Sequence, residues 1–149
     1  MISNISLEHD AKVLGIKNFQ GVYSKDKLPN PMKPGKYIAN MQNSIVHGKQ
    51  GNGTHWIMVD VRPEESIYID PFGVAPPPVI IQRATKPLHY STQQVEDIDS
   101  NLCGWICLFL LNENSRGNNY QDILNLFQKF PKTKENRYII DKYFGIKSR

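Results

Sequence analysis

Three side chains that can carry out nucleophilic catalysis occur along the chain in the order His55, Asp70 and Cys103. Cys103 follows a polar stretch and opens an almost wholly apolar run, residues 103–111. A thiol in the first turn of a helix lies in the positive field of unpaired backbone N–H groups, which favours the nucleophilic thiolate. A histidine can exchange a proton with this thiol, and a carboxylate can orient the histidine. The combination predicts the chemistry of a cysteine protease.

The segments before Cys103 predict a sheet that brings the other two groups together. Three short segments rich in β-branched or aromatic residues are bounded by Gly, Asn or Pro and predict strands: residues 37–41, 56–61 and 66–70. The last two flank a turn-forming tetrapeptide, residues 62–65, so they should form an antiparallel hairpin. In such a hairpin the start of one strand lies beside the end of the next, which places His55 next to Asp70 at one sheet edge.

The cysteine run predicts a buried central helix, because it is apolar nearly all round; Ser100 or Asn101 would cap it. Periodicity and helix-breaking residues predict the remaining elements. They are helices over residues 6–14, 120–130 and 135–144, a surface loop over 24–36, an extended stretch at the prolines 76–78 and a further strand within 88–95.

Composition limits the class of protein. The chain has 149 residues, 40% of them hydrophobic, and no apolar run close to the ~18 residues that cross a bilayer, so we expect one domain over residues 1–149 and no membrane contact. Residues 1–8 lack a secretory signal pattern, so secretion is not expected. Cys107 lies four residues after Cys103, so both should be reduced, with Cys107 buried. Scattered histidines and two cysteines on one helix lack metal-ligand spacing, so no metal is expected.

The net charge of +4 is concentrated near the C-terminus. The basic residues of this segment, which contains only Glu135 and Asp141 as acids, are Lys129, Lys132, Lys134, Arg137, Lys142, Lys147 and Arg149. Such a segment could contact DNA through its phosphates, but an exposed helix face explains the same pattern.

The motifs around the three residues resemble those of the adenovirus-type (adenain-like) maturation cysteine proteases, which include relatives in virophages, Polinton-like elements and large DNA viruses. The matching motifs are Gly53-Thr54-His55-Trp56, Tyr68-Ile69-Asp70-Pro71-Phe72-Gly73, and Ser91-Thr92-Gln93 leading to Ser100-Asn101-Leu102-Cys103-Gly104 with Cys107 following. Each is common alone, and they are specific as an ordered set.

The resemblance implies an α+β, papain-like core in which a central buried helix carries the cysteine and packs on a small mixed sheet. It implies Cys103 as nucleophile, His55 as its proton partner and Asp70 as the orienting acid. Trp56 would border the channel that holds the glycines before the cleaved bond. The substrates would be capsid or core precursors, cut after small, glycine-type residues in the virion or in the cytoplasm or nucleus of the infected cell.

The family also implies a form of regulation. Its adenovirus members are stimulated by DNA and by a peptide that attaches through a cysteine outside the active site. This chain has no cysteine outside residues 103–111. Covalent attachment of such a peptide is therefore not expected, while stimulation by DNA or by a noncovalent peptide stays open. No cofactor is expected.

Glu96 departs from the family pattern, which places a glutamine seven residues before the cysteine to donate a hydrogen bond to the oxyanion. An ionised carboxylate has no proton to donate, and losing one oxyanion donor costs about 10²- to 10³-fold in rate. We expect a shifted loop in which Gln94, ahead of Gln93, supplies the donor. A protonated Glu96, backbone N–H groups near Cys103, or a slow or inactive enzyme are the alternatives.

Other assignments remain open at this point. An isopeptidase that removes a ubiquitin-like modifier would use the same catalytic group, and a catalytically impaired module that binds nucleic acid or the virion would explain Glu96. Asp60 and Asp97 could replace Asp70 as the acid, although neither matches the family pattern. The remaining histidines are expected to be structural or exposed: His9, His47 and His89.

Overall fold

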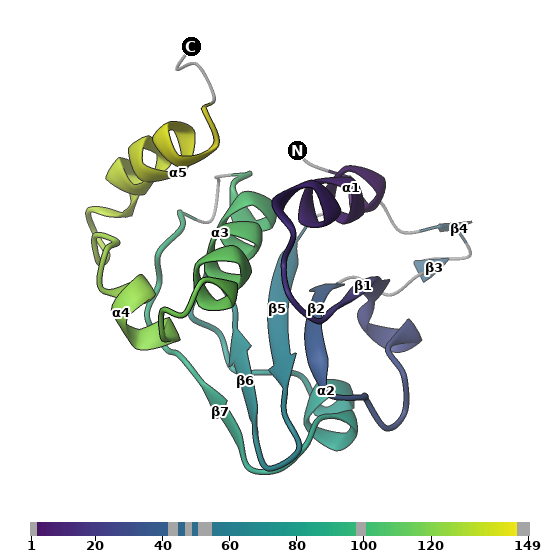
Figure 1. Ribbon diagram of the computed structural model, residues 1–149. Coiled ribbons are helices and arrows are strands. Elements are labelled where there is room, and N and C mark those ends of the chain that lie inside the picture. Colours follow the sequence, from purple (N-terminus) through teal and green to yellow (C-terminus); the bar gives the residue numbers. More distant parts are fainter. Residues whose placement is uncertain (1–2, 42–44, 47–48, 51–54, 98–100, 146–149) are drawn as a thin grey trace.

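A five-stranded mixed sheet forms the centre of the computed structural model, which describes residues 3–41, 45–46, 49–50, 55–97 and 101–145. The strand order is β1-β2-β5-β6-β7 (Figure 1). These strands are β1 (Phe19–Ser24), β2 (Gly35–Asn40), β5 (Trp56–Val61), β6 (Ser66–Ile69) and β7 (Leu88–Tyr90). The two edge strands run parallel to their neighbours, and the inner pairs are antiparallel. Two short strands, β3 (Ile45–Val46) and β4 (Lys49–Gln50), pair with each other.

Helices cover both faces of this sheet (Figure 1). One face carries α1 (Asn4–Leu14), α3 (Cys103–Ser115), α4 (Tyr120–Leu124) and α5 (Asn136–Phe144), and the other carries α2 (Pro78–Arg83). Two 3-10 turns, η1 (Lys25–Lys27) and η2 (Thr133–Glu135), complete the described elements. The architecture confirms the predicted α+β class with a buried central helix on a mixed sheet.

Strand β5 separates two hydrophobic cores. Trp56 and Met58 pack with α3 on one face, whereas Ile57 and Val59 belong to the core under α2 on the other. Successive side chains of a strand point to opposite faces, so a strand covered on both sides must be apolar on both. Every residue of β5 is accordingly buried.

Helix α3 is the main packing element of the larger core. Its residues from Ile106 to Leu111 are all buried, and Leu108 has no exposed surface. This burial explains why the run is apolar nearly all round rather than along one stripe.

Replacing Leu108 with Ala is expected to lower the free energy of unfolding by about 2–5 kcal/mol, because the change removes buried methyl groups and leaves a cavity. Leu126 is 58% exposed, and Leu126→Ala should change stability by less than about 1 kcal/mol. Urea unfolding followed by circular dichroism measures both. Equal effects of the two substitutions would contradict the placement of Leu108 in the core.

Some elements differ from their predicted form. Strand β1 was not expected, because a bulge between Phe19 and Gly21 and a Gly21 φ of 136° interrupt the alternation that marks a strand. The proline run starts a helix rather than an extended stretch: Pro77 is the N-cap of α2 and Pro78 its first residue, a position that needs no N–H donor.

The other differences concern element ends. Helix α4 ends at Leu124 rather than near residue 130, and β7 covers only residues 88–90 of the predicted segment. Helix α1 does end at Gly15, whose φ of 71° is the left-handed conformation favoured by glycine. Within the described ranges, no helix is both long enough and apolar enough to cross a bilayer.

Candidate active site

The β5–β6 hairpin brings His55 and Asp70 together. His55 directly precedes β5 and Asp70 directly follows β6, and Met58 pairs with Ile69 between them. His55 Nε2 lies 2.7 Å from Asp70 Oδ1. The predicted meeting of these two side chains at one sheet edge is confirmed.

Cys103 reaches the same place from the other side of the core, as the first residue of α3. One ring nitrogen of His55, the Cys103 sulfur and a carboxylate oxygen of Glu96 all lie within 4.8 Å of one another. Because Nε2 is held by Asp70, Nδ1 is the ring nitrogen left for the thiol; it is buried and has no other hydrogen-bond partner among the described residues. The backbone N–H of Trp56 also points at the sulfur, at 3.4 Å.

The turn after β6 fixes the orientation of the imidazole. The backbone N–H of Phe72 donates to Asp70 Oδ1 at 2.7 Å, so one carboxylate oxygen is held by both the turn and the histidine. The Phe72 ring stacks on His55 with centroids 4.1 Å apart and planes 3° apart. Gly73 has a φ of +74°, and a Cβ there would lie 2.6 Å from the carbonyl oxygen of Thr92. The motif Asp70-Pro71-Phe72-Gly73 therefore positions the acid, the ring and the neighbouring segment together.

Glu96 belongs to the same cluster. The carbonyl oxygen of Pro71 accepts from the backbone N–H groups of Val95 and Glu96, which fastens this segment to the Asp70 turn. Glu96 is 1% exposed, and its Oε2 accepts from the backbone N–H of Leu102 at 2.7 Å. A carboxylate at a helix N-terminus satisfies an N–H group there and interacts favourably with the helix dipole.

This contact corrects the predicted cap of α3. The N-cap residue is Leu102, which makes no side-chain cap hydrogen bond; Asn101 is not the cap, and Ser100 lies outside the described residues. Glu96 supplies a carboxylate acceptor next to the helix start instead. Spacing along the sequence could not reveal this, since the acceptor comes from a segment folded back against the helix.

The two glutamines before Glu96 donate to backbone carbonyl groups. Gln94 Nε2 lies 2.9 Å from the carbonyl oxygen of Glu96, and Gln93 Nε2 lies 3.0 Å from that of Leu124. In this arrangement neither amide is directed at the cysteine. Gln94 as an oxyanion donor stays a prediction, and it requires this amide to leave the Glu96 carbonyl.

The alternative acids lie in other contacts. Asp60 accepts from the Tyr120 hydroxyl at 2.7 Å and from Arg62 at 3.3 Å, and Asp97 accepts from the Thr133 hydroxyl. Asp70 is therefore the carboxylate that the fold brings to His55.

Cys107 and the described histidines other than His55 lie outside the cluster of His55, Asp70 and Cys103. Burial raises the pKa of the Cys107 thiol well above its usual value, which keeps it protonated in the core. His89 is an exposed side chain that lies 3.1 Å from Glu65, and His9 is exposed; His47 is outside the described residues.

The histidine is electrostatically tuned. Burial by itself lowers the pKa of His55, but hydrogen bonds with Asp70 and Cys103 and the charges of both raise it more, so that the pKa reaches about 9. An imidazolium therefore persists at neutral pH beside the sulfur, which is the environment that stabilises a reactive thiolate.

The pH dependence follows from this raised pKa. Below about pH 9 the ring keeps the proton that it must give to a leaving amine, and above that pH the proton is lost. We expect kcat/KM on a peptide substrate to fall through an alkaline limb with an apparent pKa of about 9. A limb near pH 6.5, the ordinary histidine value, would contradict the coupling of His55 to both partners.

The cluster is enclosed rather than open. Cys103 and Asp70 are each 2% exposed, and the side chain of His55 is 16% exposed. The sulfur is therefore nearly covered rather than open to solvent in a groove. A substrate carbonyl can reach it only if neighbouring groups move aside.

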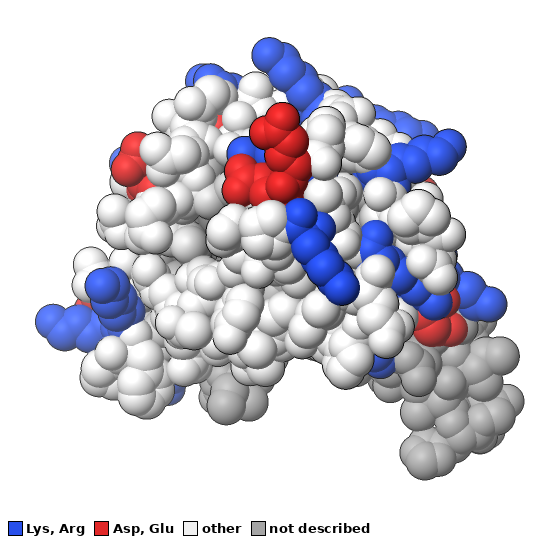
Figure 2. All heavy atoms as spheres, turned by 90° about the horizontal axis from the view of Figure 1, so that it is seen from below, with Lys and Arg blue, Asp and Glu red and all other residues white. Residues whose placement is uncertain are grey.

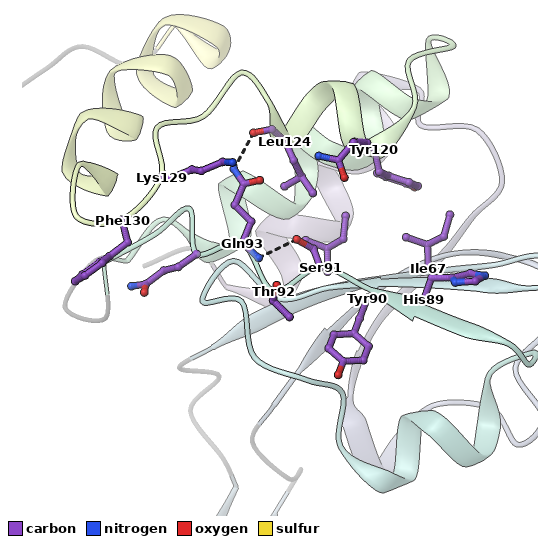
Figure 3. Close-up of a pocket in the computed structure, with 13 residues that line it drawn as sticks. Ile67, His89, Tyr90, Ser91, Thr92, Gln93, Tyr120, Leu124, Lys129 and Phe130 are labelled. Carbon is purple, nitrogen blue, oxygen red and sulfur yellow. Dashed lines mark hydrogen bonds between the residues drawn. The ribbon is translucent and has the colours of Figure 1, made fainter.

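The described cavity lies beside this cluster and does not contain it. It has a volume of about 730 Å³ and lies between the β6–β7 side of the sheet and the segment from α4 to Phe130 (Figure 3). Its walls include Ile69 and Gln94, which precede Asp70 and Glu96 in the chain. The cavity lining holds none of the three side chains His55, Asp70 and Cys103.

The basic residues near the C-terminus are only partly described. Lys147 and Arg149 lie outside the described residues, and Arg137 is 3.8 Å from Asp141. On the face shown in Figure 2, basic side chains stand apart or in small groups, with acidic ones among them. Contact with DNA stays a prediction.

The fold and the position of the cluster are those of a papain-like arrangement: a cysteine at the start of a buried helix, against a sheet edge that holds the histidine and the acid. No protein-family model matches the chain, and no curated protein matches it.

Solved structures do match. One crystal structure of the ASFV pS273R protease is 13% identical, with a TM-score of 0.56, and the match covers 92% of this chain and 66% of that one. A selenomethionine crystal structure of the same protease is 17% identical, with a TM-score of 0.44, and the match covers 68% of this chain and 42% of that one. The chain thus spans less than two thirds of the length of either structure. At 13% identity the match shows that this chain shares the fold of the ASFV pS273R protease and does not distinguish the adenain-like subtype.

Proposed function

We propose that the chain is a cysteine endopeptidase of a virus, in which Cys103 is the nucleophile, His55 its proton partner and Asp70 the orienting acid. The observation that carries this proposal is the position of His55. Its Nε2 is bound by Asp70 at 2.7 Å, which leaves Nδ1 for the sulfur of Cys103. The fold shared with a viral cysteine protease supports the same assignment.

The reaction follows from this geometry. The Cys103 thiolate attacks the scissile carbonyl carbon, and the His55 imidazolium gives its proton to the leaving amine as the C–N bond breaks. The resulting thioester is hydrolysed by a water molecule whose proton passes to the imidazole, which restores the thiolate and imidazolium pair. Asp70 stabilises the charged ring throughout and holds it in place through Phe72.

Stabilisation of the oxyanion is the unusual part of the site. Glu96 stands seven residues before Cys103, where the family that the sequence resembles has a glutamine, and its carboxylate is within 4.8 Å of the Cys103 sulfur. The N–H groups of the first turn of α3, which have no carbonyl partner within the helix, are donors that the fold provides next to the sulfur. We propose that these backbone groups carry most of the oxyanion stabilisation, and that Gln94 adds to it if it leaves the Glu96 carbonyl.

We propose viral capsid or core precursor proteins as substrates, cleaved after small, glycine-type residues. Trp56 as the border of a narrow channel is a proposal from the family resemblance: its backbone N–H lies 3.4 Å from the sulfur, but its side chain is 3% exposed and packs in the core with α3, so the indole would have to become accessible when substrate binds. Action in the virion or in the infected cell is part of the same proposal.

The experiment incubates the purified chain with a viral capsid precursor protein and, in parallel, with conjugates of ubiquitin-like modifiers. New protein termini are mapped by mass spectrometry, with the Cys103→Ala variant as the control. Cuts after small residues in the precursor support the proposal. Cuts in the modifier conjugates alone would identify an isopeptidase, and no cut in either would favour a catalytically impaired binding module.

A further inference from the structure

We propose that His55, Glu96 and Cys103 bind one zinc ion, and that this zinc-bound form holds the nucleophile inactive. The three side chains offer an imidazole nitrogen, a carboxylate oxygen and a sulfur, all within 4.8 Å of one another. The metal site stands on this geometry alone. The regulatory part of the inference rests on the proposed protease function.

The ligand set and its spacing suit zinc. Zinc binds Cys sulfur at about 2.3 Å, His nitrogen at about 2.0–2.1 Å and carboxylate oxygen at about 2.0–2.2 Å in a tetrahedral arrangement. Ligand atoms of such a site are then about 3–4 Å apart, so the present cluster has to close by no more than about 1–2 Å. Three protein ligands leave the fourth position for a water molecule.

Each proposed ligand is already held by a second group. Asp70 binds Nε2 of His55 and turns the other ring nitrogen toward the cluster, the carboxylate–histidine arrangement that commonly supports a metal ligand. The Leu102 N–H holds Oε2 of Glu96, and a carboxylate has further acceptor capacity beyond that one bond. The Trp56 N–H lies at 3.4 Å from the sulfur. The ligands are thus oriented before a metal arrives.

Charge and burial favour a divalent cation in this place. A metal ion binds cysteine as the thiolate and glutamate as the carboxylate, so two negative charges would face the cation in a cluster in which Cys103 is 2% and Glu96 1% exposed. Electrostatic attraction is stronger where water is excluded, so a cation of charge +2 between these groups is held more firmly than one at the surface. A glutamine at position 96 would remove one of the two negative charges. The proposed site therefore depends on Glu96, the residue that departs from the family pattern.

Binding of zinc would stop the proposed reaction at its first step. The sulfur lone pair that attacks the carbonyl would be shared with the metal, and the histidine could no longer exchange a proton with the sulfur. Removal of the metal by a chelator would free the Cys103 sulfur and the His55 imidazole to react again.

A titration with Co²⁺, a spectroscopic substitute for zinc, tests the site on the full chain without any substrate. We expect one equivalent to produce a near-ultraviolet thiolate-to-cobalt absorption band, which equimolar Zn²⁺ then abolishes. Cys103→Ser should remove the band, and Glu96→Gln should weaken binding at least about tenfold. Glu96→Gln keeps a side-chain oxygen for the Leu102 N–H, and thermal unfolding checks that the variant is folded.

His89 provides the matched control. It is an exposed histidine next to Glu65, with no sulfur nearby among the described residues, and is the kind of surface pair that takes up metal weakly. His89→Ala should leave the titration unchanged. A band that survives Cys103→Ser, equal affinity in Glu96→Gln and wild type, or no band at all would each overturn the proposal.

A separate assay distinguishes this inference from the proposed function. Peptide cleavage is measured in EDTA and then with added Zn²⁺. Cleavage in EDTA without cobalt binding would reject the metal site and keep the protease, whereas cobalt binding without cleavage would keep the site and reject the protease. Cleavage that continues when zinc is bound would overturn the regulatory part.

Discussion

Replacing Cys103 with Ala is expected to reduce kcat/KM on a cleaved peptide by about 10⁵- to 10⁶-fold, because the covalent step loses its nucleophile. The same substitution should leave the fold intact, since it removes a single atom at the start of α3. Steady-state kinetics on the two proteins measures the loss, and circular dichroism checks the fold.

Cys107→Ala is the matched control for this prediction. Cys107 lies one helical turn further along α3, is fully buried and has a pKa raised by burial, so it should take no part in the reaction. This variant is expected to keep most of its activity. Comparable losses in the two variants would mean that the effect is structural and that Cys103 is not the nucleophile.

Replacing Asp70 with Asn is expected to reduce kcat/KM by about 10²- to 10⁴-fold, because the carboxylate charge that supports the imidazolium is lost. The asparagine oxygen can still accept from Phe72, so the turn should survive. The alkaline limb of the pH profile should move below about pH 9, since the charge of Asp70 helps to raise the pKa of His55. Rates measured across the pH range give both effects.

Asp97→Asn serves as the control for the charge. Asp97 directly follows Glu96 in the chain, and its carboxylate contacts Thr133, whereas that of Asp70 contacts His55. Its replacement should leave the alkaline limb in place. A limb that stays at its wild-type position in Asp70→Asn would contradict the role of Asp70 as the orienting acid.

The elements that carry His55, Asp70 and Cys103 were largely predictable because they depend on local rules. Strands 56–61 and 66–69 are rich in β-branched and aromatic residues and flank a short turn, and an antiparallel hairpin then has to bring the residues at its open end together. The apolar run after Cys103 could be only a buried helix. The hairpin joins the histidine to the acid and the helix carries the thiol, whereas the meeting of the helix start with this sheet edge was implied by the family resemblance.

The surroundings of Glu96 were not predictable in the same way. Its contact with Leu102 and its closeness to Cys103 depend on how the segment 91–96 folds back on the turn after Asp70. That path depends on two backbone bonds to Pro71 and on the absence of a Cβ at Gly73, where the segment passes close by. Long-range contacts of this kind leave no periodic signal in the sequence.

The same limit applies to the proposed zinc ligands. His55, Glu96 and Cys103 are separated by long stretches of chain, whereas metal-ligand patterns are recognised from short spacings. The sequence therefore predicted no metal site, although the fold brings three candidate ligands to one place.

The enclosure of the sulfur affects how the site works. Because Cys103 is 2% exposed, the groups around it have to move aside before a peptide can react. A peptide that binds the opened site should therefore react faster than a small thiol-directed reagent of equal intrinsic reactivity. This selectivity makes a peptide-based probe more informative than a simple alkylating agent.

The most direct test of the central claim is covalent labelling with a glycine-ended peptide that carries a thiol-directed electrophile, located by mass spectrometry in wild type and in His55→Ala. Pairing of His55 with Cys103 predicts that the label appears on Cys103 alone and that its rate falls at least about tenfold without the histidine. Equal rates in the two proteins, or a label on Cys107, would contradict that pairing.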